Sequence, residues 1–237
     1  VLDRFGQIEP KLIFACTDYF YNGKHINCIP RLKEIQREIK SLDAMVTFSS
    51  KSSVSSTLES SISFESLCEN NAEDINFVQL PFDHPLYIMY SSGTTGQPKC
   101  IVHSAGGSLI QHLKEHQLHT NIKPTDVVFY YTTCGWMMWN WLVSVLASEA
   151  TIVLYDGSPF FSSPSILLDI AEREKISIFG VSAKYISAIE KQGIQPVETH
   201  RLEHMHTILS TGSPLTHGSF QYIYRCFNPS IQLSSIS

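Results

Sequence analysis

The sequence predicts an α/β fold with layered, mostly parallel sheets covered by helices, and three observations predict it. From Val127 onward, short apolar runs alternate with helical stretches of about ten residues. Helix signals separate them: Ser163-Pro164 is a typical start and Gly193 a typical stop. The chain has 237 residues, 43% hydrophobic and 16% charged, which is enough for a substantial core in a globular protein. Strands that alternate with helices favour right-handed crossovers and parallel pairing.

The first 48 residues read as one α/β unit. Lys11–Cys16 is a short apolar strand candidate, Pro30–Leu42 has apolar residues at helical spacing, and Met45–Phe48 is the next strand candidate. Residues 49–79 differ, because their first half is rich in serine and residues 69–74 are acidic and amide-rich. We expect a surface excursion there.

A glycine and hydroxyl loop follows the apolar run Leu86–Tyr90. It reads Ser91-Ser92-Gly93-Thr94-Thr95-Gly96 and is followed by Gln97-Pro98-Lys99. Glycines allow positive φ, amides in such a loop can form an anion nest, and Lys99 adds a cation. The loop therefore predicts a phosphate grip, although two residues between Gly93 and Gly96 exclude a Walker A motif. Its position after a strand agrees with ligand binding at the carboxyl ends of parallel strands, and the alternative is a turn between two hairpin strands.

A helix is expected over Ser104–Leu118, with Leu109 and Ile110 among its apolar positions. His112, His116 and His119 lie at i, i+4 and i+7, which is a possible metal-binding face. No cysteine or acidic partner stands at ligand spacing, and no HExxH motif is present. We expect exposed histidines rather than a metal site.

Strands and helices alternate through the rest of the chain. The expected strands are Val127–Tyr131, Thr151–Tyr155, Ile176–Val181, Thr207–Ser210 and Ile231–Leu233. The expected helices are Trp136–Ser148, Ser165–Lys175, Ala183–Gln192 and Thr216–Cys226.

Two further loops follow predicted strands. Gly135-Trp136-Met137 opens an aromatic, methionine-rich helix and suits an apolar pocket wall, whereas Trp139 and Trp141 are expected to pack on the sheet. Thr211-Gly212-Ser213-Pro214 precedes the last helix and can pack its backbone against a nucleotide base. Both loops belong at the ligand-binding edge of a parallel sheet.

Composition excludes several function classes. The formal net charge of −5 argues against a nucleic-acid binder. Six scattered cysteines without a CxxC pair favour reduced thiols in the cytosol. The most apolar stretch, Trp136–Ala147, is shorter than the ~20 residues that cross a bilayer. No membrane span and no signal peptide are expected.

The glycine loop resembles the ATP-phosphate loop of the adenylate-forming superfamily, which includes acyl-CoA synthetases, luciferases and peptide-synthetase adenylation domains. The runs SSGTTGQPKCIVHSAGG, GWMMWNW and HTILSTGSPL resemble, more narrowly, the acetoacetyl-CoA synthetase family. The resemblance implies that residues 1–237 are part of the large N-terminal AMP-binding domain, without the small C-terminal domain.

The resemblance also implies a reaction and roles for residues. Acetoacetate, ATP and CoA would give acetoacetyl-CoA, AMP and diphosphate, with Mg²⁺ as cofactor. Ser213 stands where the family usually has glutamate, which puts a role for that side chain in doubt. No metal ligand and no catalytic residue is assigned within the chain, because the family's magnesium segment and adenylation lysine would lie beyond Ser237. The implied residues are Ser91, Ser92, Gly93, Thr94, Thr95, Gly96 and Lys99 for the ATP phosphates, Gly212, Ser213 and Pro214 beside the adenine, and Trp136, Met137 and Thr211 around the acyl group.

Two alternatives stay open at this point. One is a luciferase-like or other short-acyl adenylating enzyme, because pocket shape discriminates one methylene by only ~1–3 kcal/mol. The other is a catalytically dead truncated isoform that serves as a binding module.

We predict that these 237 residues alone are inactive, because the segments that complete the reaction in the family are missing from them. Acetoacetate-dependent exchange of pyrophosphate into ATP, measured on the purified chain, should stay at background. Exchange above background would contradict this prediction.

Overall fold

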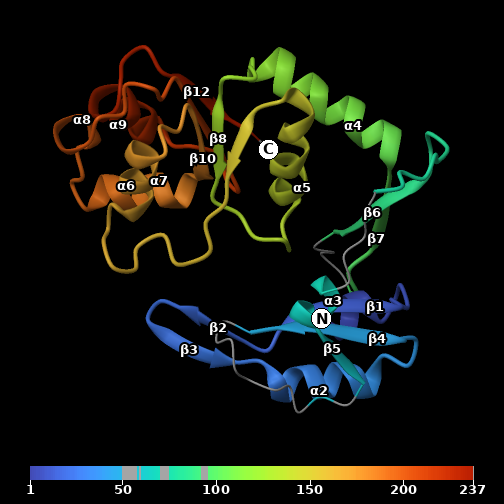
Figure 1. Ribbon diagram of the computed structural model, residues 1–237. Coiled ribbons are helices and arrows are strands. Elements are labelled where there is room, and N and C mark those ends of the chain that lie inside the picture. The colour runs from blue at the N-terminus through green and yellow to red at the C-terminus, as the bar shows by residue number, and fades with distance from the viewer. Residues whose placement is uncertain (50–57, 59, 70–74, 92–95, 237) are drawn as a thin grey trace. The chain divides into compact units, whose positions relative to one another are not determined.

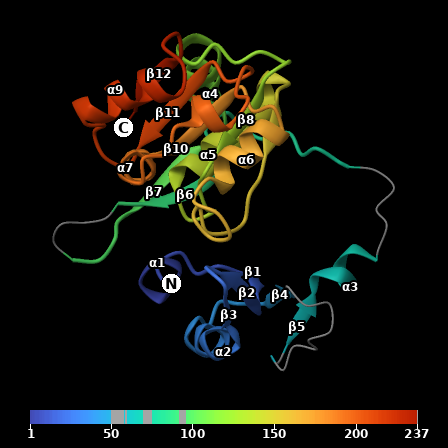
Figure 2. The ribbon, with the colours of Figure 1, turned by 90° about the vertical axis from the view of Figure 1, so that its left-hand side faces the viewer.

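The computed structural model describes residues 1–49, 58, 60–69, 75–91 and 96–236. The chain divides into two compact units, Val1–Gly106 and Gly107–Ser237. The second unit is built on a five-stranded, fully parallel sheet of order β12-β11-β10-β8-β9 (Figures 1 and 2). Its strands are β8 (Val127–Tyr130), β9 (Thr151–Val153), β10 (Ile178–Ser182), β11 (Thr207–Thr211) and β12 (Gln232–Ser235).

Helices cover both faces of this sheet, with α6, α7 and α9 on one side and α5 on the other (Figure 1). Successive residues of a strand point to opposite faces. Phe129 therefore packs with α6 and α7, while its neighbours Val128 and Tyr130 pack with Trp141 of α5. The helices of this unit are α4 (Ala105–Lys114), the π-helix η1 (Glu115–His119), α5 (Met137–Ser144), the 3₁₀-helix η2 (Val145–Ser148), α6 (Ile166–Arg173), α7 (Ala183–Lys191), α8 (Pro196–Thr199) and α9 (His217–Cys226).

The predicted alternation is confirmed, with boundaries shifted by one to a few residues. Two helix starts are fixed by side-chain caps: the Ser182 hydroxyl accepts from the Tyr185 amide at 3.1 Å, and the Thr216 hydroxyl accepts from the Ser219 amide at 3.2 Å. The short helix α8 was not expected. Within the described residues, no helix combines the length and apolar character needed to cross a membrane.

The expectation of exposed histidines is confirmed for His119 and was wrong for His112 and His116. His112 and His116 are buried, with 5% and 0% of their surface exposed, while Leu109 and Ile110 are 45% and 61% exposed. Helical spacing identifies residues that share a face but not which face is buried. The imidazoles are buried because they find polar partners on α5.

The first unit has a smaller parallel sheet of order β1-β4-β5, with α2 packed on it. Leu32 of α2 and Met45 of β4 form its core with Leu58. The helix expected to reach Leu42 ends at Glu38, because Ile39 has an extended backbone. These elements are α1 (Leu2–Phe5), β1 (Leu12–Cys16), α2 (Ile29–Glu38), β4 (Ala44–Phe48), β5 (Ser61–Ser63) and α3 (Phe64–Cys68).

Part of the range 49–79 belongs to this sheet. Ser61–Ser63 pairs in parallel with β4, and α3 follows it directly. Residues 61–68 thus form regular elements, and residues 62–68 are exposed on the surface of the unit. Serine-rich composition hid this short strand because only one apolar residue, Ile62, lies within it.

A hairpin of β2 (Asp18–Tyr21) and β3 (Lys24–Asn27) was not expected. Its turn residues Asn22 and Gly23 have φ of 50° and 74°. An Asn-Gly pair with positive φ at both positions is the preferred two-residue hairpin turn, so the sequence did carry the signal.

The strands beside the glycine loop also form a hairpin. β6 (Pro85–Tyr90) pairs antiparallel with β7 (Cys100–Ser104) in a sheet of two strands. The expectation that this loop ends a strand of a parallel sheet was therefore wrong, and the hairpin alternative gives the observed connection. A loop that connects two hairpin strands can still bind phosphate.

The strands of the second unit are tied together at their amino ends by Asp126. Its Oδ1 accepts from the Ser177 hydroxyl at 2.8 Å and from His206 Nε2 at 3.0 Å, and its Oδ2 accepts from the Lys123 amide at 2.7 Å. Burial alone would raise the pKa of Asp126, but these hydrogen bonds outweigh it and lower the pKa below 3.8. One carboxylate thus links the starts of β8, β10 and β11.

Asp126→Asn should lower the free energy of unfolding by about 1–3 kcal/mol, because buried donors lose their charged acceptor. The pKa of Asp126 is lower in the folded chain than in the unfolded chain. Its contribution is therefore complete above the unfolded pKa and is lost as pH falls through the folded value. Urea unfolding from pH 7 to pH 3 measures both effects.

The matched control is Asp43→Asn. Asp43 is 76% exposed and lies 4.0 Å from Lys11 Nζ. Such a surface pair contributes about 0–1 kcal/mol. An Asp126 variant no less stable than this control would refute the structural role of Asp126.

Candidate active site

A cavity of about 570 Å³ lies at the carboxyl ends of β11 and β12 in the second unit. This is the edge at which ligands bind in open parallel sheets. One wall comes from α5, one from η1, and one from the residues that end the two strands. The lining residues are Glu115, His119, Thr120, Trp136, Met137, Met138, Trp141, Leu209, Thr211, Gly212, Ser234, Ser235 and Ile236.

The cavity brings together Trp136 and Thr211, which lie 75 positions apart in the sequence. Trp136 and Met137 enter from the start of α5, and Thr211 enters from the end of β11. All three were expected around an acyl group. Trp136 is 69% exposed and Met137 43% exposed, so both offer apolar surface to a ligand.

A second hollow of about 560 Å³ shares Thr211 and Gly212 with the first. Gly212, Ser213 and Pro214, the residues expected beside adenine, line it with Ser235 and Ile236. Gly212 has φ of +90°, and an added Cβ would meet no atom within 4 Å. The backbone conformation rather than lack of space therefore requires glycine between the two hollows.

Glu115 and Trp141, two cavity residues whose role sequence reasoning missed, form a network behind the cavity wall with the buried His116. Trp141 Nε1 donates to Glu115 Oε2 at 3.1 Å, and His116 Nε2 donates to the Trp141 carbonyl at 3.1 Å. The His116 ring packs edge-on against Trp141, with centroids 4.5 Å apart. Trp141 itself was expected to be buried, and it is 2% exposed. Its role as cavity wall had no sequence signal, because the π-helical turn that presents Glu115 cannot be recognised from residue pattern.

The imidazole of His116 is held neutral. Burial, first, and the nearby His112 lower its pKa to about 4, although the Trp141 carbonyl and Glu115 act in the opposite direction. His112 itself makes a 2.8 Å hydrogen bond between Nδ1 and the Ser144 hydroxyl. The two histidines therefore serve as packing and hydrogen-bonding groups between α4 and α5.

The glycine loop lies in the first unit and is described only at its ends. Ser92, Gly93, Thr94 and Thr95 lie outside the described residues. Ser91 and Lys99 close the hairpin, since the Ser91 amide donates to the Lys99 carbonyl at 3.0 Å. Gly96 has φ of +120°, in the region that favours glycine, and Lys99 is exposed.

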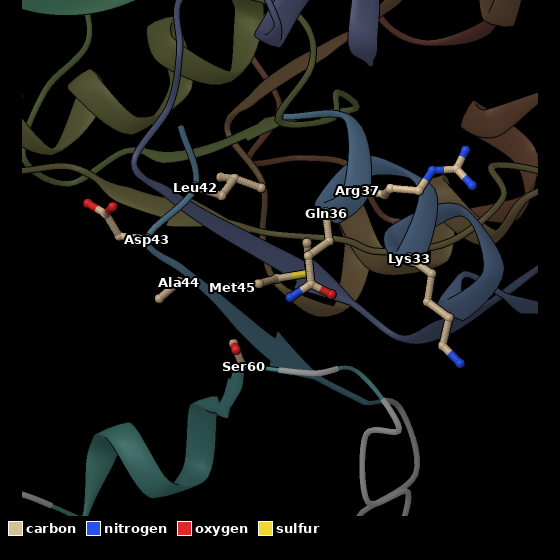
Figure 3. A pocket seen from close by; sticks show the side chains of 8 residues that line it. All are labelled: Lys33, Gln36, Arg37, Leu42, Asp43, Ala44, Met45 and Ser60. Carbon is tan, nitrogen blue, oxygen red and sulfur yellow. The ribbon is translucent and has the colours of Figure 1, made fainter. Parts of the chain in front are cut away.

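The first unit has a hollow of about 580 Å³ between α2 and β4 (Figure 3). Lys33 and Arg37 lie on its rim, but their charged ends extend in different directions, and Asp43 points away from both (Figure 3). A small-molecule site needs polar groups that converge. This hollow is therefore a weaker candidate than the cavity of the second unit.

Among the described residues, no group of three or more His, Cys, Asp or Glu side chains is arranged to hold a metal ion. The three histidines of the α4 region do not converge on a metal: two make hydrogen bonds to α5, and His119 is exposed.

A parallel sheet with a pocket at its carboxyl edge is the arrangement found in α/β domains that bind small molecules. The sequence pattern of the family described as "AMP-binding enzyme" matches residues 3–234. The chain belongs to this family.

Individual relatives narrow the similarity further within this family. The chain is 49% identical over 245 residues to acetoacetyl-CoA synthetase of Gallus gallus, covering 100% of this chain and 37% of that protein. A malonamoyl-CoA synthetase of Penicillium aethiopicum is 41% identical over 259 residues, covering 100% and 36%. The solved structure of acetoacetyl-CoA synthetase from Streptomyces lividans superposes with a TM-score of 0.92 at 40% identity, covering 100% of this chain and 36% of that one. The chain thus spans little more than a third of these proteins.

His116→Gln should flatten the dependence of stability on pH. The folded chain binds fewer protons at His116 than the unfolded chain between about pH 4 and 6.5, so stability falls as pH falls through this window. The shift corresponds to about 3 kcal/mol at ~1.4 kcal/mol per unit. Urea midpoints at pH 7 and pH 4.5 should differ less in His116→Gln than in the wild type.

The control variant is His119→Gln, on the same helical segment but exposed. It should keep the wild-type pH dependence. Equal slopes for all three proteins would show that His116 is not the buried titrating group.

Proposed function

We propose that this chain is the nucleotide- and acid-binding part of an enzyme that joins acetoacetate to CoA at the expense of ATP. Acetoacetate attacks the α-phosphorus of ATP to give acetoacetyl-adenylate and pyrophosphate. The CoA thiol then displaces AMP. The observation that carries the proposal is the cavity shared by Trp136, Met137 and Thr211, beside the hollow of Gly212–Pro214.

The chemistry of the two hollows supports this assignment. The first offers aromatic and thioether surface with a few polar groups, which suits a short acid. The second is framed by backbone and small side chains, which suits a flat base. Whole-chain similarity to acetoacetyl-CoA synthetases adds support. The Penicillium relative, named for malonamoyl-CoA, supports the broader class of short 3-carbonyl acids.

Lys99 and the loop of residues 91–96 are proposed to bind the phosphates of ATP. A preorganised cation and amides stabilise charge on departing pyrophosphate. Mg²⁺ accompanies ATP in such chemistry, and the described residues contain no group of three or more His, Cys, Asp or Glu side chains arranged to hold a metal ion. We therefore assign no magnesium ligand in this chain.

We also propose a cytosolic location. All six cysteines are thiols in the structure, and the most exposed of them suit a reducing compartment.

The proposal is tested in a hybrid enzyme, in which residues 1–237 replace the matching segment of the Gallus gallus relative. The hybrid should catalyse acetoacetate-dependent exchange of pyrophosphate into ATP and form a CoA thioester. An inactive but folded hybrid, or light emission with luciferin in place of thioester formation, would contradict the proposed function.

Lys99→Ala in this hybrid should slow exchange on the order of 100-fold, because one preorganised charge is lost. Transfer from premade acetoacetyl-adenylate to CoA should change much less. Lys184→Ala, at an exposed lysine on α7, is the matched control. An unchanged exchange rate in Lys99→Ala would refute the role of Lys99.

A further inference from the structure

Glu115 is the one Asp, Glu, Lys or Arg among the described residues that line the cavity. We propose that Glu115 determines the specificity of this cavity: its carboxylate admits short acids with a neutral far end and excludes acids with a second carboxylate. This inference rests on the proposed function and specifies which acids the site takes.

The Glu115 carboxylate is held in a fixed position. Oε2 accepts from Trp141 Nε1 at 3.1 Å, and Oε1 accepts from Gln111 Nε2 at 2.7 Å. Trp141 is itself immobilised by its edge-on packing against His116 and Tyr130. An ionised carboxylate has about four acceptor positions. Glu115 can therefore still accept a hydrogen bond from a ligand in the cavity.

The negative charge of Glu115 is not neutralised by its neighbours. No ion pair involving Glu115 is found in the part of the chain that the structure describes. His116 stays neutral near pH 7, because burial lowers its pKa to about 4. Lys114 Nζ donates to Gln111 Oε1 at 3.1 Å rather than to Glu115. A ligand in the cavity therefore meets a carboxylate that makes no ion pair among the described residues.

This charge also orients the acid. The reacting carboxylate of the substrate is repelled by Glu115, so it must point away, toward the uncharged Thr211 and Gly212. The far end of the acid then faces Glu115. Acetoacetate, malonamate and malonate share one skeleton and differ only in that end, which is a methyl, an amide or a carboxylate. Glu115 tolerates the methyl, accepts from the amide N–H and repels the carboxylate.

The hybrid enzyme tests this with the three acids in the pyrophosphate exchange assay. Wild-type sequence should use acetoacetate and malonamate and discriminate strongly against malonate. Glu115→Gln keeps an acceptor for Trp141 and removes the charge. It should raise the ratio of kcat/KM for malonate over acetoacetate by about tenfold or more. The preference for malonamate should fall, because its N–H loses a charged acceptor.

The matched control is Glu174→Gln, which removes one surface carboxylate that pairs with Arg173 outside the cavity. It should leave all three ratios unchanged. An unchanged malonate ratio in Glu115→Gln would overturn the proposal. A wild-type hybrid that uses malonate as well as malonamate would also overturn the proposal. That measurement does not depend on the folding of a variant.

Failure of the proposed function gives a different result. A hybrid inactive with every acid contradicts acetoacetate activation, and binding to the purified chain then decides the role of Glu115. Quenching of tryptophan fluorescence should show weaker binding of malonate than of malonamate, and Glu115→Gln should remove the difference. Equal affinities in the wild-type chain would overturn the proposal.

Discussion

The structure of the second unit depends on one constraint: a parallel sheet must be covered on both faces. The fully buried Phe129 and Val128 are neighbours on β8 that face opposite helical layers. With both faces closed, polar groups can gather only at the two ends of the strands. Asp126 occupies the amino ends with a closed set of hydrogen bonds, and the carboxyl ends are left open as a cavity.

The layer that covers the second face also builds the cavity wall. Trp141 packs against Tyr130 of the sheet with one edge and borders the cavity with another. The buried His116 hydrogen-bonds to the Trp141 carbonyl, which also accepts from the Ser144 hydroxyl, and the imidazole stays uncharged. The same side chains therefore contribute to folding stability and to the geometry of the cavity. A substitution at His116 should change both.

Much of this could be predicted from sequence, and the limit is physical. Strands β8 and β10 were recognisable because burial on both faces produces nearly continuous apolar runs. The loops at Trp136 and Thr211 were recognisable because each comes after a predicted strand, Val127–Tyr131 and Thr207–Ser210. Periodicity, however, cannot tell the inner face of a helix from the outer one. The apolar Leu109 is therefore exposed and the polar His116 is buried, because His116 finds its partner on α5.

The π-helical turn of η1 is the feature furthest from sequence prediction, and the proposed site depends on it. The Thr120 amide donates to the Glu115 carbonyl, five residues back, at 2.9 Å. The Ile122 amide donates to the His116 carbonyl at 2.8 Å. This wide turn lets residues four and five positions after Glu115, His119 and Thr120, line the cavity with it. Such turns are rare and are often found at functional sites. Here His116 of the turn contacts Trp141, and Trp141 hydrogen-bonds to Glu115, so the residues that pack on the turn also position Glu115.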